Sequence, residues 1–385
     1  MNAPIKDTLI KDAPLIDAPI IYEESMSYRL DPELEPPSRF PTDLLIRLEK
    51  AEGNLEAVSH LQHLARRRTL KVILELVKVG TTRNAEGTQL SYSITPFLSG
   101  TITLEEVWND LREVNQEALM DCVLDAVRRF QGLRVQDDNV IQALQHHSNA
   151  GGDSKPLLKT LIGGPDTGYH LDIKSLLESF LHPEAAKLSM CQIIDQNDGI
   201  AIRSLDDDAE IVELSQVDLD TLSKHVVLCH NDLEPRNILV KRADLKGNDG
   251  NPWYELVATI DWEVAGLFPF AYEFGLKDTC LGTSNLLFSW YSLFKKKTST
   301  LLPAGEAHEK LIRALRIIDQ SNRKSIPRNV GVRVRAAWIK WECLVMHADV
   351  TRVWVRKNGV ADIPAFTKED QASLENEVLK ELGYI

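Results

Sequence analysis

The sequence predicts an α+β fold with two lobes, and three observations support this prediction. A chain of 385 residues exceeds what a single ordinary hydrophobic core holds. Runs typical of β-strands are concentrated before residue 96, whereas helical periodicity dominates the rest of the chain. We therefore expect a small sheet-containing lobe over residues 1–96 and a mainly helical lobe over residues 97–385.

The N-terminal lobe is predicted to begin with an irregular arm over residues 1–40, which prolines interrupt repeatedly. Helical spacing of leucine and valine predicts a helix over residues 54–67, with Asn54 as its N-cap. Strands are predicted in three segments rich in β-branched or alternating apolar residues, 43–49, 69–79 and 89–94.

The C-terminal lobe is predicted to open with a capping box, in which Thr103 precedes Glu106 by three residues. The next clear pattern is an amphipathic helix over residues 115–131. A helix over 217–224 has Asp218 or Asp220 as its expected N-cap. Further helices are predicted over residues 171–182, 282–296, 304–321, 328–355 and 367–382.

Composition excludes several classes of protein. A net charge of −13 and a pI near 5.3 argue against nucleic-acid binding, which needs a basic face. The five cysteines are widely spaced and form no C-x-x-C pair, so neither a disulfide framework nor a zinc site is expected. No apolar run approaches the roughly 20 residues of a membrane span. We therefore expect a cytoplasmic protein without membrane or nucleic-acid partners.

Residues 226–240 are the most informative stretch, because two apolar runs flank a short polar segment. The pattern predicts a strand, a tight loop and a second strand, with His230, Asp232 and Asn237 in the loop. A later apolar run stops at Asp261, about 24 residues after Asn237. Loops that follow rigid strands commonly carry catalytic groups.

This set of side chains suits phosphoryl transfer. The spacing H-x-D-x-x-x-x-N, followed by a strand that ends in aspartate, is the one that kinases use. Asp232 is the candidate base for the acceptor proton, whereas Asn237 and Asp261 offer oxygen ligands to Mg²⁺. The alternative is that Asp232 and Asn237 merely cap a turn. His230 is expected to brace the loop rather than to touch substrate.

The sequences HNDLEPRNILV and IDWEVAG resemble the aminoglycoside phosphotransferase-like family, close to the choline kinases and nearest to its fungal branch. The matching residues are Leu233, Pro235, Arg236, Asn237, Ile238, Leu239, Asp261, Trp262, Glu263, Ala265 and Gly266. Two positions depart from the family pattern. Asn231 replaces the usual glycine, and Glu234 replaces a histidine and adds a negative charge near the site.

The resemblance implies a bilobal, protein-kinase-like fold and an ATP-dependent phosphotransferase that uses Mg²⁺. It implies that Arg47 contacts phosphate, in an ion pair with Glu56 from the following helix. It also implies that residues 95–100 form the hinge at which the adenine ring binds, with Thr95 and Phe97 as cofactor contacts.

The family likeness implies an acceptor pocket lined by C-terminal helices, for a hydroxyl or amine of a small molecule. His230 and Arg236 join Asp232 as catalytic candidates. Glu263 is expected to orient Arg236 or a substrate amine, and Glu234 and Glu273 are further candidate acceptor contacts.

Two alternatives remain open, a degenerate kinase that only binds and an enzyme of other chemistry on the same scaffold. The missing glycine-rich loop favours the first, since the first glycine of the chain is Gly53. The intact Asp232, Asn237 and Asp261 oppose it. The lack of D-F-G and A-P-E motifs argues against a protein kinase.

Overall fold

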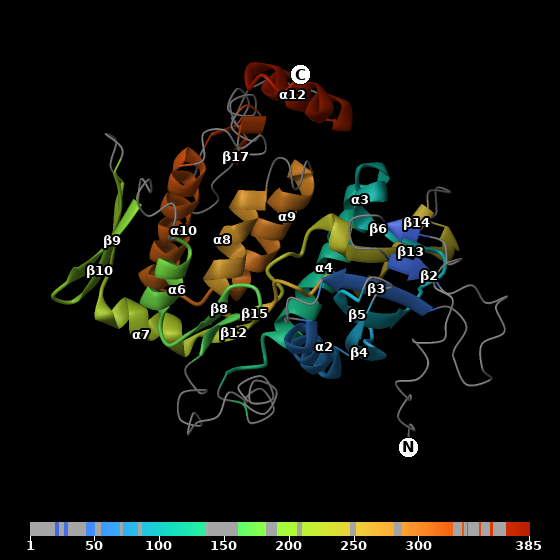
Figure 1. The fold of residues 1–385 in the computed structure, drawn as a ribbon, viewed down its shortest axis with the longest axis horizontal. Helices are drawn as coiled ribbons and strands as arrows, with labels where there is room; N and C mark the ends of the chain where they lie inside the picture. Colours follow the sequence, from blue (N-terminus) through green and yellow to red (C-terminus); the bar gives the residue numbers. More distant parts are fainter. Residues whose placement is uncertain are drawn as a thin grey trace.

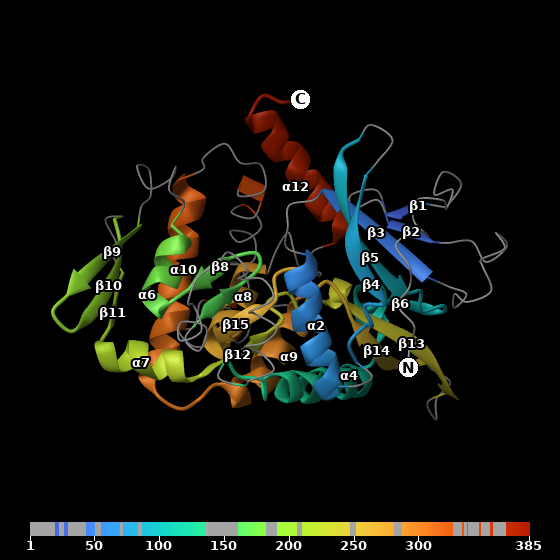
Figure 2. The same ribbon diagram turned by 60° about the horizontal axis from the view of Figure 1, so that its bottom comes forward.

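The computed structural model has an α+β fold, as predicted, with antiparallel sheets and a set of central and C-terminal helices (Figures 1 and 2). The N-terminal sheet lies at one end of the long axis, and the β9–β11 sheet lies at the other. The structure describes residues 20–22, 27–29, 44–50, 55–69, 72–83, 87–135, 137, 161–181, 191–205, 210–246, 252–280, 287–325, 333–334, 337, 346–347, 355–356 and 367–385.

The N-terminal sheet is antiparallel, with the strand order β1-β2-β3-β5-β4. Its elements, with the helix that follows β3, are β1 (Ile20–Tyr22), β2 (Ser27–Arg29), β3 (Leu44–Lys50), α2 (Leu55–Thr69), β4 (Lys78–Arg83) and β5 (Gln89–Pro96). Leu44, Ile46 and Leu48 alternate along β3 and are buried in one small core. The same alternation turns Arg47 to the opposite face.

The prediction of a strand over residues 69–79 is wrong for most of that range. Thr69 ends α2, and in the described part of the segment Ile73 forms an isolated bridge with Thr259 before a paired strand begins at Lys78. The physical reason is that Ile73 is buried, 1% exposed, beside β14 instead of joining the N-terminal sheet. The strand forms later, at β4, where Gly80 lets the Tyr92 ring approach the backbone closely.

A second sheet has the order β14-β13-β6 and leads to the loop region. Its strands and the helices beside it are β6 (Thr101–Thr103), α3 (Leu104–Val107), α4 (Glu113–Phe130), β13 (Ile238–Lys246) and β14 (Pro252–Thr259). The predicted capping box at Thr103 and Glu106 is confirmed. Asn115 of α4 binds both backbone groups of Tyr254, donating to its carbonyl (3.2 Å) and accepting from its N–H (3.1 Å).

A third sheet, of order β12-β15-β7-β8, supports the start of the polar loop. Its strands and the helices that follow are β7 (Ile162–Gly164), β8 (Gly168–His170), β12 (Val226–Cys229), β15 (Gly266–Pro269), α8 (Phe270–Cys280) and α9 (Phe288–Thr298). β12 and β15 pair antiparallel, with Cys229 opposite Gly266. Cys229 is fully buried, as expected for a small apolar group.

The far end of the molecule combines a three-stranded sheet with α10. Its elements are α6 (Ile173–Ser179), β9 (Cys191–Gln196), β10 (Gly199–Ser204), β11 (Ile211–Leu214), α7 (Gln216–Lys224) and α10 (Glu306–Ser325). The N-cap of α7 is Ser215, and Asp218 is the acidic partner in its capping box rather than the cap itself.

The C-terminal part departs from one helix prediction. The described residues within the predicted helix 328–355 include a strand, β16 (Met346–His347), which pairs with β17 (Val355–Arg356). β-branched residues and tryptophan around residues 350–355 favour such pairing over a helix. The last helix, α12 (Lys368–Glu381), is confirmed. Across the described ranges, no helix is both long and apolar enough to span a bilayer.

We predict that Asn115→Ala destabilises the fold by about 2 kcal/mol, because it removes two hydrogen bonds and leaves the backbone groups of Tyr254 without these partners. Urea unfolding monitored by circular dichroism measures this loss. Asn109→Ala, at an exposed position nearby, is the control and should leave the midpoint unchanged. Equal midpoints for Asn115→Ala and wild type would contradict the structural role of this contact.

Candidate active site

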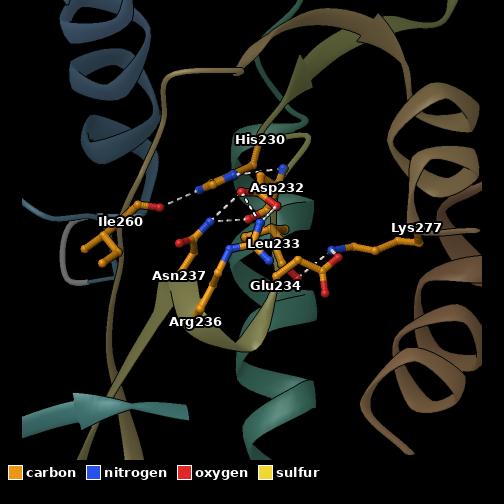
Figure 3. Close-up of polar contacts among 8 residues, drawn as sticks. All are labelled: His230, Asp232, Leu233, Glu234, Arg236, Asn237, Ile260 and Lys277. Carbon is orange, nitrogen blue, oxygen red and sulfur yellow. Dashed lines mark hydrogen bonds and ion pairs between the residues drawn. The ribbon is translucent and has the colours of Figure 1, made fainter. Parts of the chain in front are cut away.

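The loop between β12 and β13 holds the Asp232 carboxylate in a defined position (Figure 3). Arg236 Nη2 donates to Oδ1 and Oδ2 of Asp232, both at 2.8 Å. The side-chain amide of Asn237 donates to the same carboxylate (2.7 Å) and to the Asp232 carbonyl (3.0 Å). The side chain of Asp232 is 18% exposed, so part of it remains accessible to solvent.

His230 is fully buried and supports this loop through hydrogen bonds at both of its ring nitrogens. The backbone N–H of Asp232 donates to Nδ1 (3.3 Å), which leaves Nε2–H to donate to the Ile260 carbonyl (3.0 Å). Burial lowers the pKa of His230 to about 4, so the ring is neutral near pH 7. Its place in the structure matches the bracing role that we expected and keeps it away from solvent.

The two positions that depart from the family pattern have physical explanations. Asn231 has φ of +67°, a left-handed conformation that asparagine tolerates better than most residues, and so it can replace glycine. Its side-chain amide donates to the Val264 carbonyl at 2.8 Å. Glu234 is fully buried and binds Lys277 Nζ at 2.6 Å. Its charge is therefore compensated, which corrects the expectation that Glu234 adds negative charge to the acceptor site.

Pairing of β13 with β14 brings Asp261 to this loop. Ile238 lies opposite Thr259, and the next residue, Ile260, donates its N–H to the Asn237 carbonyl (3.0 Å). Asp261 then adopts φ of +62°, an uncommon value for aspartate, which turns the chain immediately after the strand. Burial, aided by the negative charges of Glu263 and Asp232, raises the pKa of Asp261 against the opposing effect of Arg47.

Arg47 reaches the site from β3 but has partners other than the one predicted. Its guanidinium contacts Asp261 Oδ1 (3.4 Å), Glu263 Oε2 (2.9 Å) and Glu49 Oε2 (3.4 Å). Glu56 is exposed in the first turn of α2 and forms no ion pair with Arg47 among the residues that the structure describes. The two acidic residues that follow β14, Asp261 and Glu263, lie within ion-pair distance of the guanidinium.

The candidate acceptor contacts are distributed differently from the prediction. Glu273, at the start of α8, is fully buried and accepts a hydrogen bond from the His230 backbone N–H at 3.2 Å. Burial raises the pKa of Glu273 to about 7. It therefore anchors the loop instead of lining an open pocket. Glu263 is exposed, and its carboxylate pairs with Arg47.

Sequence reasoning missed Lys277, which is 2% exposed and touches the loop directly. One signal was available, because Lys277 lies one helical turn after Glu273 in a largely apolar segment. A buried lysine needs a carboxylate partner, and Glu234 is the unusual carboxylate of the motif. The two observations together would have suggested the pair.

The proposed hinge residues lie where the N-terminal sheet connects to the β14-β13-β6 sheet. Thr95 is the second-to-last residue of β5 and pairs with Leu45 of β3. Phe97 follows that strand directly, and both residues are half-buried. Thr95 therefore lies on the strand next to β3, which carries Arg47.

The donor set at the loop suits a hard cation better than a soft one. It consists of oxygen donors, the carboxylates of Asp232 and Asp261 and the side-chain amide of Asn237. Burial, followed by the negative charges of Glu263 and Asp232, raises the pKa of Asp261, and a divalent cation bound here would favour its ionised form. No cluster of three histidine, cysteine, aspartate or glutamate side chains suited to a metal occurs in the described part of the chain. A cation here would take further oxygen ligands from its substrate.

Comparisons with known proteins give structural matches at low identity. No protein-family model matches the chain, and no curated protein matches it. A microcompartment-associated aminopropanol kinase is 12% identical, over 97% of this chain and 94% of its own, with a TM-score of 0.38. A spectinomycin phosphotransferase in complex with ADP and spectinomycin is 12% identical, over 92% and 89%, with a TM-score of 0.31. An ADP-bound aminoglycoside phosphotransferase is 12% identical, over 92% and 93%, with a TM-score of 0.30.

The buried His230 predicts a specific pH dependence of stability. Its pKa falls from 6.5 to about 4 on folding, so the unfolded chain binds a proton first as the pH drops. The contribution of the neutral ring is complete above pH 6.5 and is lost progressively toward pH 4. We expect the difference in unfolding free energy between wild type and His230→Gln to shrink by up to about 3 kcal/mol over this range.

Urea unfolding of both proteins at a series of pH values measures this difference. Because every other titrating group is common to the two proteins, the comparison isolates the imidazole. Parallel stability curves from pH 7 to about pH 4 would contradict the neutral, buried state of His230.

Proposed function

We propose that the protein transfers the γ-phosphoryl group of ATP to a hydroxyl, or an amine, of a small molecule. In this reaction the bond between the γ-phosphorus and the bridging oxygen to the β-phosphate breaks, and a bond forms from the acceptor oxygen or nitrogen to phosphorus. ADP leaves, and the acceptor proton passes to a base. The observation that carries the proposal is the convergence of Asp232, Asn237 and Asp261 on one loop and one strand end.

Asp232 is the proposed base. Arg236 and Asn237 orient its carboxylate, and His230 fixes the backbone N–H behind it. The partial exposure of the carboxylate leaves room for an acceptor to donate a hydrogen bond. Arg236 serves to align the Asp232 carboxylate through two hydrogen bonds, which places it in the catalytic group as a charged partner of the base.

Asp261 and Asn237 are the proposed ligands of Mg²⁺, with Asp232 nearby. When bound, Mg²⁺ supplies neutralisation of the phosphate oxygens of the nucleotide. The protein residues contribute a rigid oxygen donor set, because the β13–β14 pairing fixes Asp261 relative to Asn237. Arg47 is half-buried above Asp261 and is the proposed phosphate contact.

The nucleotide is proposed to bind between β3 and the segment after β5. Arg47 would reach its phosphates, and Thr95 and Phe97 would contact the adenine ring from the connection between the sheets. The resemblance of the loop motif to the choline kinase-like proteins supports a small acceptor. The acidic net charge of −13 supports a neutral or cationic acceptor over an anionic one.

We predict that Asp232→Asn binds ATP as wild type does but loses about 100- to 10,000-fold in kcat, because the base is removed while its shape is kept. Coupled detection of ADP, with a panel of hydroxyl and amino compounds as acceptors, measures kcat. Asp125→Asn, on the exposed face of α4, is the control and should keep full activity. Normal turnover of Asp232→Asn would refute the assignment of the base.

We predict that ATP binds the protein more tightly with Mg²⁺ than without it, and that Asp261→Ala abolishes this difference. Calorimetric titration of purified wild type and variant, each with and without Mg²⁺, measures it directly. Glu263→Gln is the matched control, because it removes a second acidic partner of Arg47 but keeps the proposed metal ligand. Absence of ATP binding by wild type would instead favour a scaffold that has lost its nucleotide role.

A further inference from the structure

Two buried lysines project from the α8–α9 region, and one of them contacts the catalytic loop. Lys277 Nζ donates to Glu234 Oε1 and to the Leu233 carbonyl, both at 2.6 Å, and it lies over the Phe294 ring at 4.6 Å. Lys277 is 2% exposed and Glu234 is fully buried. A charge in such a place is stable only with close partners, so this contact is geometrically fixed.

The position of the contact along the loop is informative (Figure 3). Leu233 and Glu234 directly follow Asp232, so Lys277 holds the backbone on the C-terminal side of the proposed base. Glu273, one turn earlier on α8, accepts from the His230 N–H on the N-terminal side. Side chains of one helix, α8, therefore form hydrogen bonds with the backbone on both sides of Asp232.

The contact between Lys277 and the Leu233 carbonyl affects the orientation of the Asp232 carboxylate. The Leu233 carbonyl belongs to the peptide group between Leu233 and Glu234, so rotation of this group would shift the chain one residue after Asp232 and, through it, the Asp232 side chain, even if the Arg236 contact were kept. Donation from Lys277 to the Leu233 carbonyl prevents this rotation, and the bond to Glu234 fixes Lys277 in turn. In-line transfer is sensitive to such movement, because a shift of about 1 Å can cost on the order of 100-fold in rate.

We propose that Lys277, together with Glu234, is a positioning pair that sets the orientation of Asp232 from α8. This inference rests on the proposed function for its effect on rate. Its structural half, the immobilisation of residues 232–237, stands without that function. The pair acts through the backbone, and neither side chain reaches solvent or an acceptor.

The chain offers a matched control in the second buried lysine. Lys295 is 3% exposed, binds Asp278 Oδ1 (3.0 Å) and the Phe274 carbonyl (2.8 Å), and lies over the Phe274 ring at 3.5 Å. Its carbonyl partner belongs to α8 rather than to the loop. Lys277→Met and Lys295→Met therefore remove the same kind of buried ion pair, but only the first removes a contact with the loop.

The experiment compares kcat, the KM for ATP, and hydrogen–deuterium exchange of peptides spanning residues 226–240 in wild type, Lys277→Met and Lys295→Met. Thermal unfolding of all three proteins controls for stability. We expect Lys277→Met to lower kcat on the order of 100-fold with KM for ATP within about twofold, and to accelerate exchange in the loop. Lys295→Met should lose similar stability, with kcat and loop exchange close to wild type.

A further variant keeps the test decisive if Lys277→Met is too unstable to purify. Glu234→Gln/Lys277→Met also removes the buried negative charge whose lysine partner is lost, and it should fold better than the single variant. Its kcat should stay low, because the Leu233 carbonyl still lacks its donor. Recovery of kcat along with stability would overturn the proposal, and so would equal losses of kcat in Lys277→Met and Lys295→Met.

The two proposals fail in different ways. If wild type transfers phosphate to no acceptor, the proposed function fails, whereas loop exchange still tests the positioning role. Unchanged exchange over residues 226–240 in Lys277→Met would overturn the positioning role whether or not the protein is a kinase.

Discussion

The antiparallel pairing of β13 with β14 is the constraint on which the site depends. Its register places Asn237 beside Ile260, where a backbone hydrogen bond of 3.0 Å joins the two strand ends. Asp261 follows directly, so the same pairing delivers the second carboxylate to the first. A slip by one residue would turn the side chains of β14 to the opposite face and remove Asp261 from the loop.

The two sides of the site around this pairing differ in how deeply their side chains are buried. On the α8 side, His230, Glu273 and the Glu234–Lys277 pair are buried and hydrogen-bonded to the loop. On the β3 side, Arg47 is 33% exposed and shares its charge among three carboxylates. The loop around Asp232 is thus held by low-dielectric contacts, whereas Arg47 pairs with its carboxylates in a more exposed setting.

Much of the fold followed from local patterns. The predicted helices that begin near residues 54, 115 and 367 are present, since each has a clear apolar period or a capping residue. Where the prediction failed, a long-range contact decided the result. Burial of Ile73 against β14 displaced the predicted strand 69–79, and pairing of β16 with β17 replaced part of a predicted helix.

The sequence by itself determined the residue types and spacing of Asp232, Asn237 and Asp261, because their order along strand and loop is a local property of the chain. Only the tertiary structure decided the partners of the charged groups. Arg47 meets Asp261 and Glu263 instead of Glu56, Glu273 is an anchor, and Lys277 neutralises Glu234. Charges are paired by proximity in space and by the loss of water around them, and neither can be read from spacing along the chain.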